Sequence, residues 1–424
     1  MQRSQPNGML DFEGVYYDAQ CLLQHSDPYK VGEPLRVYQS ENGNLPQSSD
    51  VLRRVLIMNV YPPTAFIFTV PFAMLAWEPA YVLWIILTAG SLILAAFLMW
   101  NLAENYSPGV SILMICFVLV NSEVLFVTGN VAGIVVSLCM VAVWCFLKGR
   151  FVPVGVLCLA ISLAIKPHDS GLVWLYFLLA GGVYRKRALQ TLVVTIAISL
   201  PAVLWVWHVS PQWMQELRSN LLATCLKDPG VASVSSQTAS MASMVINLHP
   251  AIRVFWNDPR IYNPVSYLVC GTLLLVWVVR TLRLQFSQRG AWLALAAIVP
   301  LTMLVTYHWP HDAKLLMLTV PACSMLWTEG GSIRWIALLV NSAGIMLTAD
   351  IPLAIFLILT RNLHPNSATI LGQIMTVVLT QPIPLILLVM GIFYLWIYLR
   401  RDPSRVATAL SGESGEMPLA PTPS

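Results

Sequence analysis

Charged residues are scarce in this sequence, and their scarcity argues against a water-soluble fold. Only 10% of the 424 residues are Asp, Glu, Lys or Arg, whereas 57% are hydrophobic, and the mean hydropathy is +0.70. Soluble domains carry roughly a quarter of charged residues, so a soluble fold of this length could not hide so much apolar surface. The chain is therefore predicted to be an all-α, polytopic membrane protein.

Several signatures of ligand chemistry are also missing. The net charge of +4 is small and spread among loops, which argues against a nucleic-acid partner. The sequence has no CxxC pair, no Cys/His metal spacing and no glycine-rich nucleotide loop. Six of the eight cysteines lie in apolar runs and are expected to be buried. Cys21 and Cys225 lie in polar segments, where pairing in an oxidising compartment is the alternative to two free thiols. No cofactor is predicted.

The polar start of the chain contains a stretch that is rich in titratable and aromatic side chains. Residues 11–29 hold three aspartates, a glutamate, a histidine and three tyrosines. Asp11, Val15 and Asp18 recur at helical spacing, which predicts a short amphipathic helix that begins at Asp11. Pro28 ends it, because proline biases the preceding residue away from helix. No signal peptide precedes Asp11.

Apolar runs follow from Tyr61 onward and predict about 11–13 membrane segments with soft boundaries. The predicted organisation is an external polar segment 1–60, a membrane domain 61–400 with an external loop 209–264, and a disordered cytoplasmic tail 401–424. The last run is expected to break at Gln381-Pro382. Segments are expected at 61–78, 80–100, 109–127, 129–147, 152–166, 170–184, 189–208, 265–280, 291–307, 313–327, 333–350 and 368–399.

Basic residues predict the orientation of these segments. Lysines and arginines cluster at alternating turns, which the positive-inside tendency places in the cytoplasm. The turns around Lys166, 209–264, 307–312 and 351–367 are then external. Residues 1–59 share that side only if 109–127 is a half-crossing hairpin. The basic turns hold Lys148, Arg150, Arg185, Lys186, Arg187, Arg280, Arg283, Arg289, Arg334, Arg400, Arg401 and Arg405.

Two external turns carry charge where charge is expensive. In Lys166-Pro-His168-Asp169, Lys166 is either a snorkelling interfacial lysine with Asp169 as partner, or a cation offered with His168 to an anionic group such as a phosphate. Residues 307–314 contain two histidines, an aspartate and a lysine, and they form either a plain aromatic-belt turn or part of a site. His308-x-x-His311 is not the i, i+4 helical pair that binds zinc well, so no metal is predicted.

Asn121, Glu123 and Asn130 are expected either to satisfy one another between helices or to line a cavity.

An ordered set of short motifs resembles glycosyltransferase family 87, membrane enzymes of the GT-C type that include polyprenyl-phosphate-mannose-dependent mannosyltransferases. The resemblance runs from about residue 11 to 330. It is carried by Asp11, Tyr17, Asp27-Pro28-Tyr29, Tyr61-Pro62-Pro63, Pro71, Gly129-Asn130, Gly149-Arg150, Lys166-Pro167 and His308 to Asp312.

The resemblance implies a GT-C helical bundle, a polyprenyl-phosphate sugar as donor and a glycan or glycolipid as acceptor. It implies that Asp11 is the general base and that His308 or His311 faces the same cavity. It also implies that Lys166 meets the donor phosphate, and the further candidates for substrate binding are His168, His311, Tyr17 and Asn130. The enzyme is expected in the cell (plasma) membrane with its site on the external side.

This chemistry is consistent with elementary requirements. A lipid-phosphate donor already has a leaving group and needs positive charge to stabilise the departing anion. The acceptor hydroxyl needs a carboxylate to take its proton. A single displacement then inverts the anomeric carbon. The alternative function is a lipid or sugar transporter or flippase, which broken helices and midplane polar residues would suit.

Two features depart from the family pattern. The family has Gly-Gln where this chain has Gly129-Asn130, and the shorter amide keeps the hydrogen-bonding capacity. The family also places a membrane span before the aspartate, whereas ten residues precede Asp11. We therefore expect a chain extended upstream to transfer sugar better than this one.

Overall fold

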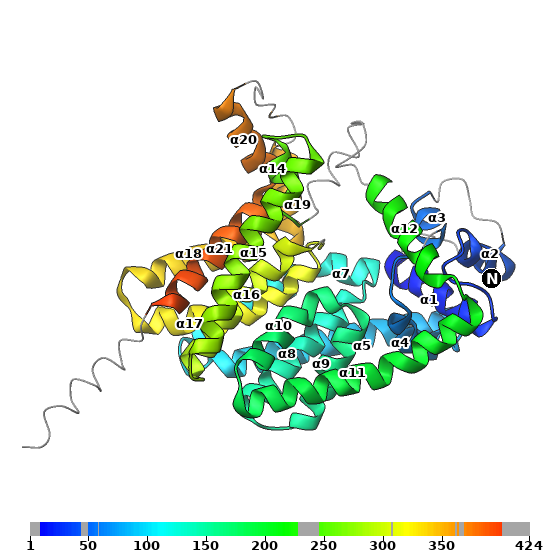
Figure 1. Ribbon diagram of the computed structural model, residues 1–424, viewed down its shortest axis with the longest axis horizontal. Coiled ribbons are helices and arrows are strands. Elements are labelled where there is room, and N and C mark those ends of the chain that lie inside the picture. Colours follow the sequence, from blue (N-terminus) through cyan, green and yellow to red (C-terminus); the bar gives the residue numbers. More distant parts are fainter. Residues whose placement is uncertain are drawn as a thin grey trace, which may run out of the picture.

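The computed structural model describes residues 9–43, 50–57, 59–227, 246–306, 308–360, 363 and 369–400, and these are almost entirely helical (Figure 1). Within these ranges the extended backbone is limited to one antiparallel bridge between Ile246 and His308. The all-α prediction is confirmed. Tyr307, the side chain of Cys225 and the predicted disordered tail 401–424 lie outside the described residues.

The predicted N-terminal helix forms, but it is enclosed rather than laid on a surface. Helix α1 (Leu10–Leu23) has Asp11 and Glu13 in its first turn, where carboxylates favour the helix dipole. Ten of its fourteen residues are buried, and Cys21 is a free, buried thiol. The chain turns before Pro28, with the Asp27 carboxylate accepting from the backbone N–H of Tyr29 at 2.9 Å. Around α1 lie α2 (Glu33–Asn42), α3 (Asp50–Ile57) and α4 (Pro63–Ala73).

Helix α4 does not carry the chain across a membrane, which corrects the expected segment 61–78. It is 11 residues long. At its beginning the Tyr29 hydroxyl donates to the carbonyl of Tyr61 at 2.8 Å. Just after its end the Tyr16 hydroxyl donates to the carbonyl of Leu75 at 2.8 Å. Because both ends are bonded to residues 16–29, α4 begins and ends beside the α1 segment.

The next two crossings return the chain to α1. Helix α5 (Trp77–Ala103) leaves from the α4 end. Helices α6 (Pro108–Val120) and α7 (Glu123–Thr128) come back, and the backbone N–H of Met9 donates to the carbonyl of Val127 at 2.7 Å. Together α6 and α7 form one candidate span of 21 residues. Residues 9–43 therefore lie on the same side of the membrane as Gly129. The half-crossing hairpin at 109–127, which the sequence analysis needed for this arrangement, is not required.

The rest of the bundle follows the predicted runs closely. The segment 313–327 differs, because it is a 3₁₀ stretch followed by a short helix. The region 351–367 differs as well, because an apolar helix occupies residues 350–360 where the sequence suggested an external turn. The expected break at Gln381-Pro382 is confirmed. The remaining elements are α8 (Ala132–Lys148), α9 (Val152–Ile165), α10 (Pro167–Leu179), α11 (Gly182–Val209), α12 (Trp213–Lys227), α14 (His249–Arg253), α15 (Pro259–Arg283), α16 (Gln288–Val305), η1 (Asp312–Thr319), α17 (Val320–Glu329), α18 (Gly331–Leu347), α19 (Asp350–Thr360), α20 (Ile370–Thr380) and α21 (Pro382–Leu399).

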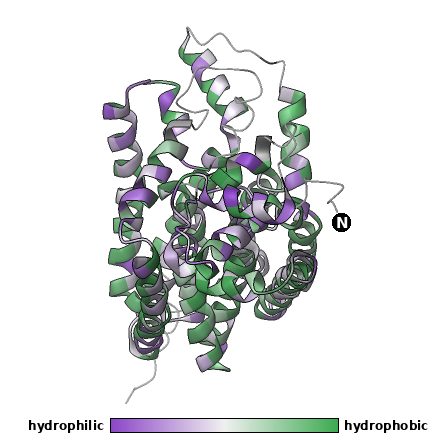
Figure 2. Ribbon diagram, turned by 90° about the vertical axis from the view of Figure 1, so that its right-hand side faces the viewer, coloured by the Kyte–Doolittle hydropathy of each residue, from purple (hydrophilic) through white to green (hydrophobic). Residues whose placement is uncertain are grey.

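Six helical segments of the described chain are long and apolar enough to cross a membrane. The bent pair α18 and α19, which meet at 78°, makes a seventh if it counts as one span. Four shorter apolar helices of 11 to 17 residues (α4, α8, α9 and α20) account for further predicted runs. Figure 2 shows apolar residues along the long helices and polar residues gathered in the N-terminal segment that faces the viewer. The chain is thus a multi-pass membrane protein.

The centre of the bundle is α16, which packs against α21, η1, α10 and α15. In the most apolar part of α16, 78% of the residues are buried, whereas in the corresponding part of α11 only 11% are buried. Because α11 is apolar and yet mostly exposed on the protein surface, it faces lipid. The basic turns meet one another at the far ends of these helices. Arg187 donates to the last turn of α8 at Phe146, and Arg280 donates to the carbonyls of Tyr398 and Arg400.

Candidate active site

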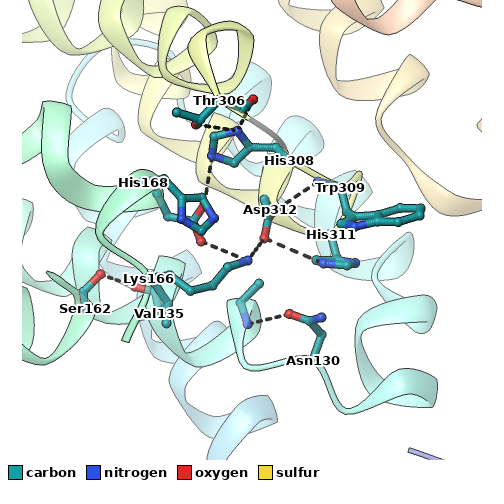
Figure 3. A network of polar contacts seen from close by, with 12 residues as sticks. Asn130, Val135, Ser162, Lys166, His168, Thr306, His308, Trp309, His311 and Asp312 are labelled. Carbon is teal, nitrogen blue, oxygen red and sulfur yellow. Dashed lines mark hydrogen bonds and ion pairs between the residues drawn. The ribbon is translucent and has the colours of Figure 1, made fainter. Parts of the chain in front are cut away.

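Lys166 is buried between two carboxylates at the junction of α9 and α10 (Figure 3). Its ammonium lies 2.5 Å from Asp312 Oδ1 and 3.4 Å from Asp169 Oδ2. The residue is 8% exposed, so it does not snorkel to an interface. Its nearer partner is Asp312, 146 residues further along the chain, rather than Asp169 as the local spacing suggested. The same Asp312 carboxylate accepts from the backbone N–H of Trp309, which fixes the 308–312 turn.

Two histidines face the other oxygen of Asp169. His308 Nε2 lies 3.1 Å and His168 Nε2 lies 3.7 Å from Asp169 Oδ1. His308 Nδ1 is 3.1 Å from the carbonyl and 3.3 Å from the hydroxyl of Thr306. In the tautomer with the hydrogen on Nδ1, this nitrogen donates to the carbonyl, which can only accept. Burial lowers the pKa of His168 to about 4. Burial alone would also lower the pKa of His308, but contact with Asp169 raises it.

Asp11 lies near this group because α1 packs closely against Gly129. Gly129 has φ +65°, and a Cβ there would lie 2.8 Å from that of Phe12. A side chain at this position would therefore push α1 away. The next residue, Asn130, donates from Nδ2 to Asp11 Oδ2 at 2.8 Å. Its Oδ1 accepts from the backbone N–H of Ala132, so the amide is oriented by the start of α8.

Tyr61 and His311 are close enough to Asp11, Lys166 and Asp312 to be affected by their charges. Burial raises the pKa of the Tyr61 hydroxyl, and Asp11, Lys166 and Asp312 all act on it through their charges. Burial lowers the pKa of His311, which senses Asp312, Lys166 and Asp11. His311 Nε2 is 3.7 Å from Asp312 Oδ1. The structure therefore brings Asp11, Asn130, Lys166, His168, His308 and His311 to one end of the bundle.

The segment 209–264 contributes to this end in two places. The backbones of Ile246 and His308 bond to each other, at 2.8 and 3.3 Å. In α12, Asn220 donates to the carbonyls of Tyr29 and Asn59. The sequence left open whether this segment is a cover or a plain connector, and these contacts show that it packs directly on the site residue His308.

Lys314 points away from the group, although it lies only two residues after Asp312. Its ammonium bonds to the carbonyl of Asn121 at 2.5 Å and lies 3.4 Å from Asp350 Oδ1. Asp350 also accepts from the backbone N–H of Val124. This second buried pair ties η1 to the α6–α7 break and to the start of α19. Asn121 and Asn130 thus bond to separate partners rather than to each other.

Tyr17 is the one predicted site residue that the structure does not bring to this group. It is 1% exposed, accepts from Asn42 Nδ2 at 2.7 Å and packs against Tyr16 and Tyr38. Six residues after Asp11 in a helix, it lies on a different face. The sequence analysis named Asp169 only as the partner of a snorkelling lysine, and it gave Asp312 and Tyr61 no role. The signal for each was its place inside a motif already singled out.

The sequence pattern of glycosyltransferase family 87 matches residues 59–307. That range is more than half of the chain. The chain belongs to glycosyltransferase family 87. No curated protein and no solved structure matches it. The matched range contains Asn130 and Lys166 and ends one residue before His308.

Membership of glycosyltransferase family 87 makes the protein a membrane-bound transferase and decides against the transporter alternative. Asp11 and the 308–312 turn lie outside the matched range. Their connection to Lys166 and Asn130 comes from the contacts above. The polar end of the bundle that these contacts define is the candidate active site of the glycosyltransferase.

Proposed function

We propose that this glycosyltransferase moves a hexose, mannose first among them, from a polyprenyl-phosphate donor to a hydroxyl of a glycan or glycolipid. Asp11 is the general base, and the sugar is transferred with inversion. The observation that carries the proposal is the half-buried Asp11 carboxylate, held by Asn130 next to the buried Lys166 group. A lipid donor suits a site at the end of a membrane bundle, because its chain stays in the bilayer.

The exposure of each side chain decides which substrate it can contact. Asp11 is only partly buried, so an acceptor hydroxyl can reach it and lose its proton there. His168 keeps 35% of its side chain exposed, which makes it the histidine that a donor phosphate can contact. Lys166 lies behind it and supplies positive charge from within. Stabilising the departing phosphate by fixed charge in a water-poor site is the largest contribution such a site can make.

The proposal is tested by transfer from radiolabelled polyprenyl-phosphate mannose to candidate acceptors, with the purified protein in nanodiscs. Asp11→Asn is expected to lower the rate by roughly 10²–10⁴-fold, the range for loss of a general base, with the melting temperature kept. Asp258→Asn is the matched control, because Asp258 is an exposed carboxylate that caps α15 and Asn caps equally well. Undiminished transfer by Asp11→Asn removes Asp11 as the base.

The orientation of the protein belongs to the proposal as well. The basic ends of α8, α11, α15 and α21 lie away from the site. Cytoplasmic basic turns then place Asp11 and Lys166 on the external side of the plasma membrane.

A further inference from the structure

The buried charges around Lys166 do not balance. The group contains one ammonium, from Lys166, and two carboxylates, from Asp169 and Asp312, all at most 8% exposed. With neutral imidazoles it carries one net negative charge. A buried net charge is costly, and proteins compensate it with a counter-ion or a proton. A cation bound among these side chains would compensate that charge.

Three side chains converge where such a cation would lie. His168 Nε2, His308 Nε2 and an oxygen of Asp169 all lie within 4.8 Å of one another. The two edges that run from Asp169 Oδ1 to the histidines measure 3.1 and 3.7 Å. Ligands about 2.1 Å from a tetrahedral zinc ion are ~3.4 Å apart, so these edges already have the length of a coordination polyhedron.

The contact between His308 Nε2 and Asp169 Oδ1 brings two possible ligand atoms together. Among the described residues, His308 Nε2 and both Asp169 oxygens are buried and have no hydrogen-bond partner. They are nonetheless 3.1 Å apart, so the carboxylate oxygen lies off the axis of the ring nitrogen. In the tautomer with the hydrogen on Nδ1, His308 donates to the Thr306 carbonyl. Its Nε2 lone pair then faces inward, which is the arrangement of a metal-bound histidine.

Lys166 does not occupy this position. Its short contact is with Asp312, and it approaches Asp169 on Oδ2 at 3.4 Å, whereas both histidines lie against Oδ1. The lysine therefore orients the carboxylate from behind and leaves Oδ1 as the ligand atom.

We propose that His168, Asp169 and His308 bind a divalent transition-metal ion of the Zn²⁺ class, with a fourth position open on the exposed side of His168. Two imidazoles and one carboxylate suit zinc, whereas Mg²⁺ and Ca²⁺ prefer oxygen ligands. The site departs from the sequence-based expectation of no metal, because its ligands come from two turns and the His308–His311 pair is not used. The metal proposal rests on the geometry of these three side chains and not on the identity of the donor or acceptor, and it places the ion beside the histidine that is proposed to meet the donor phosphate.

The test measures metal directly on the full chain, purified through a histidine-free tag and held in nanodiscs without donor lipid. After chelation and addition of Zn²⁺, the wild-type protein is expected to retain about one ion per chain by elemental analysis. His308→Ala and His168→Ala are expected to lower the affinity by more than about tenfold, the loss seen even for a supporting residue. His25→Asn is the control, since His25 is exposed and its left-handed backbone accepts asparagine.

A second measurement guards against variants that fold poorly. Zn²⁺ is expected to raise the melting temperature of the wild type and of His25→Asn, but not of His168→Ala, whose side chain is partly exposed and whose loss leaves the core intact. Bound Co²⁺ should show the absorption of a four-coordinate ion. A wild-type chain that retains no Zn²⁺, or variants that retain as much as the wild type, would overturn the proposal. Because no donor is present, this failure is separate from failure of the Asp11 test.

Discussion

At the scale of single residues, the site depends on a lysine that two carboxylates enclose. The Lys166 ammonium and Asp312 Oδ1 are 2.5 Å apart inside the protein. Buried pairs add little net stability, but removal of one partner leaves a charge that water cannot reach. Substitution of either residue alone is therefore expected to destabilise the protein. The pair also holds the 308–312 turn next to α10.

We expect Asp312→Asn to destabilise the folded protein by about 3–5 kcal/mol, because Lys166 loses its nearer partner. Lys166→Met combined with Asp312→Asn should destabilise the protein by less than the sum of the two single losses, because the contact between the two side chains is then removed only once. Thermal unfolding of the two single variants and the double variant forms the cycle. Strictly additive losses would show that the two side chains do not interact.

Asp18 provides a pH-dependent test on α1. Burial raises the pKa of this carboxyl well above its ordinary 3.8. As pH rises above about 4, the unfolded chain releases the proton while the folded chain keeps it, so stability falls until the folded pKa is passed. Asp18→Asn lacks this penalty and should melt higher than the wild type at neutral pH, with the difference vanishing near pH 4. A lower melting temperature at neutral pH would mean that the charged carboxylate is needed.

At the scale of elements, glycines set how closely the helices that carry the site approach one another. A Cβ on Gly133, the second residue of α8, would meet Leu125 of α7 and Thr88 of α5 at 2.8 Å. Gly133 lies three residues after Asn130, so this contact positions the turn that holds Asp11. Gly90, in the middle of α5, has nothing within 4 Å of such a Cβ.

Gly133→Ala is accordingly expected to cost about 1–3 kcal/mol through overpacking and to lower sugar transfer by displacing Asn130. Gly90→Ala is the matched control and should be neutral or stabilising by up to about 1 kcal/mol, because alanine is the better helix former. Melting temperature and transfer rate are measured for both. Equal behaviour of the two variants would exclude close packing at Gly133.

Some features of the helices could be predicted from the sequence, and others could not. The break at Gln381-Pro382 and the helix beginning near Asp11 are local consequences of proline and of periodicity, and both were predictable. The role of α4 was not, because an 11-residue buried helix and part of a span have the same apolar composition. Likewise, the proximity of Lys166 and Asp169 suggested a pair, whereas the nearer partner lies 146 residues away. Long-range contacts have no signature in one sequence.

At the scale of the whole molecule, the bundle has a polar end and a basic end. Asp11, Lys166 and His308 mark the first, and Arg187 and Arg280 mark the second. Helices that run between the two ends, such as α11 and α15, are long enough to span a bilayer. The ends therefore lie on opposite sides of the membrane.

This polarity predicts how cysteines introduced at exposed positions will react in intact cells. Gln212→Cys, just after α11 on the polar side, should be labelled by a membrane-impermeant maleimide. Lys186→Cys, at the basic start of α11, should be labelled only after the cells are opened. The chain without an added cysteine gives the background. The reverse pattern would place the active site in the cytoplasm.

The pairing of Lys166 with Asp312 also has a consequence for biosynthesis. The two residues are 146 positions apart, so at 5–20 residues per second a ribosome makes the lysine roughly 7–30 s before its partner. During that interval α9 has been made but the lysine at its end lacks its nearer counter-charge. Until Asp312 is made, Lys166 has only the more distant Asp169, three residues further on, as a counter-charge. The 308–312 turn is thus the last part of the site to be translated, and it completes the ion pair of Lys166.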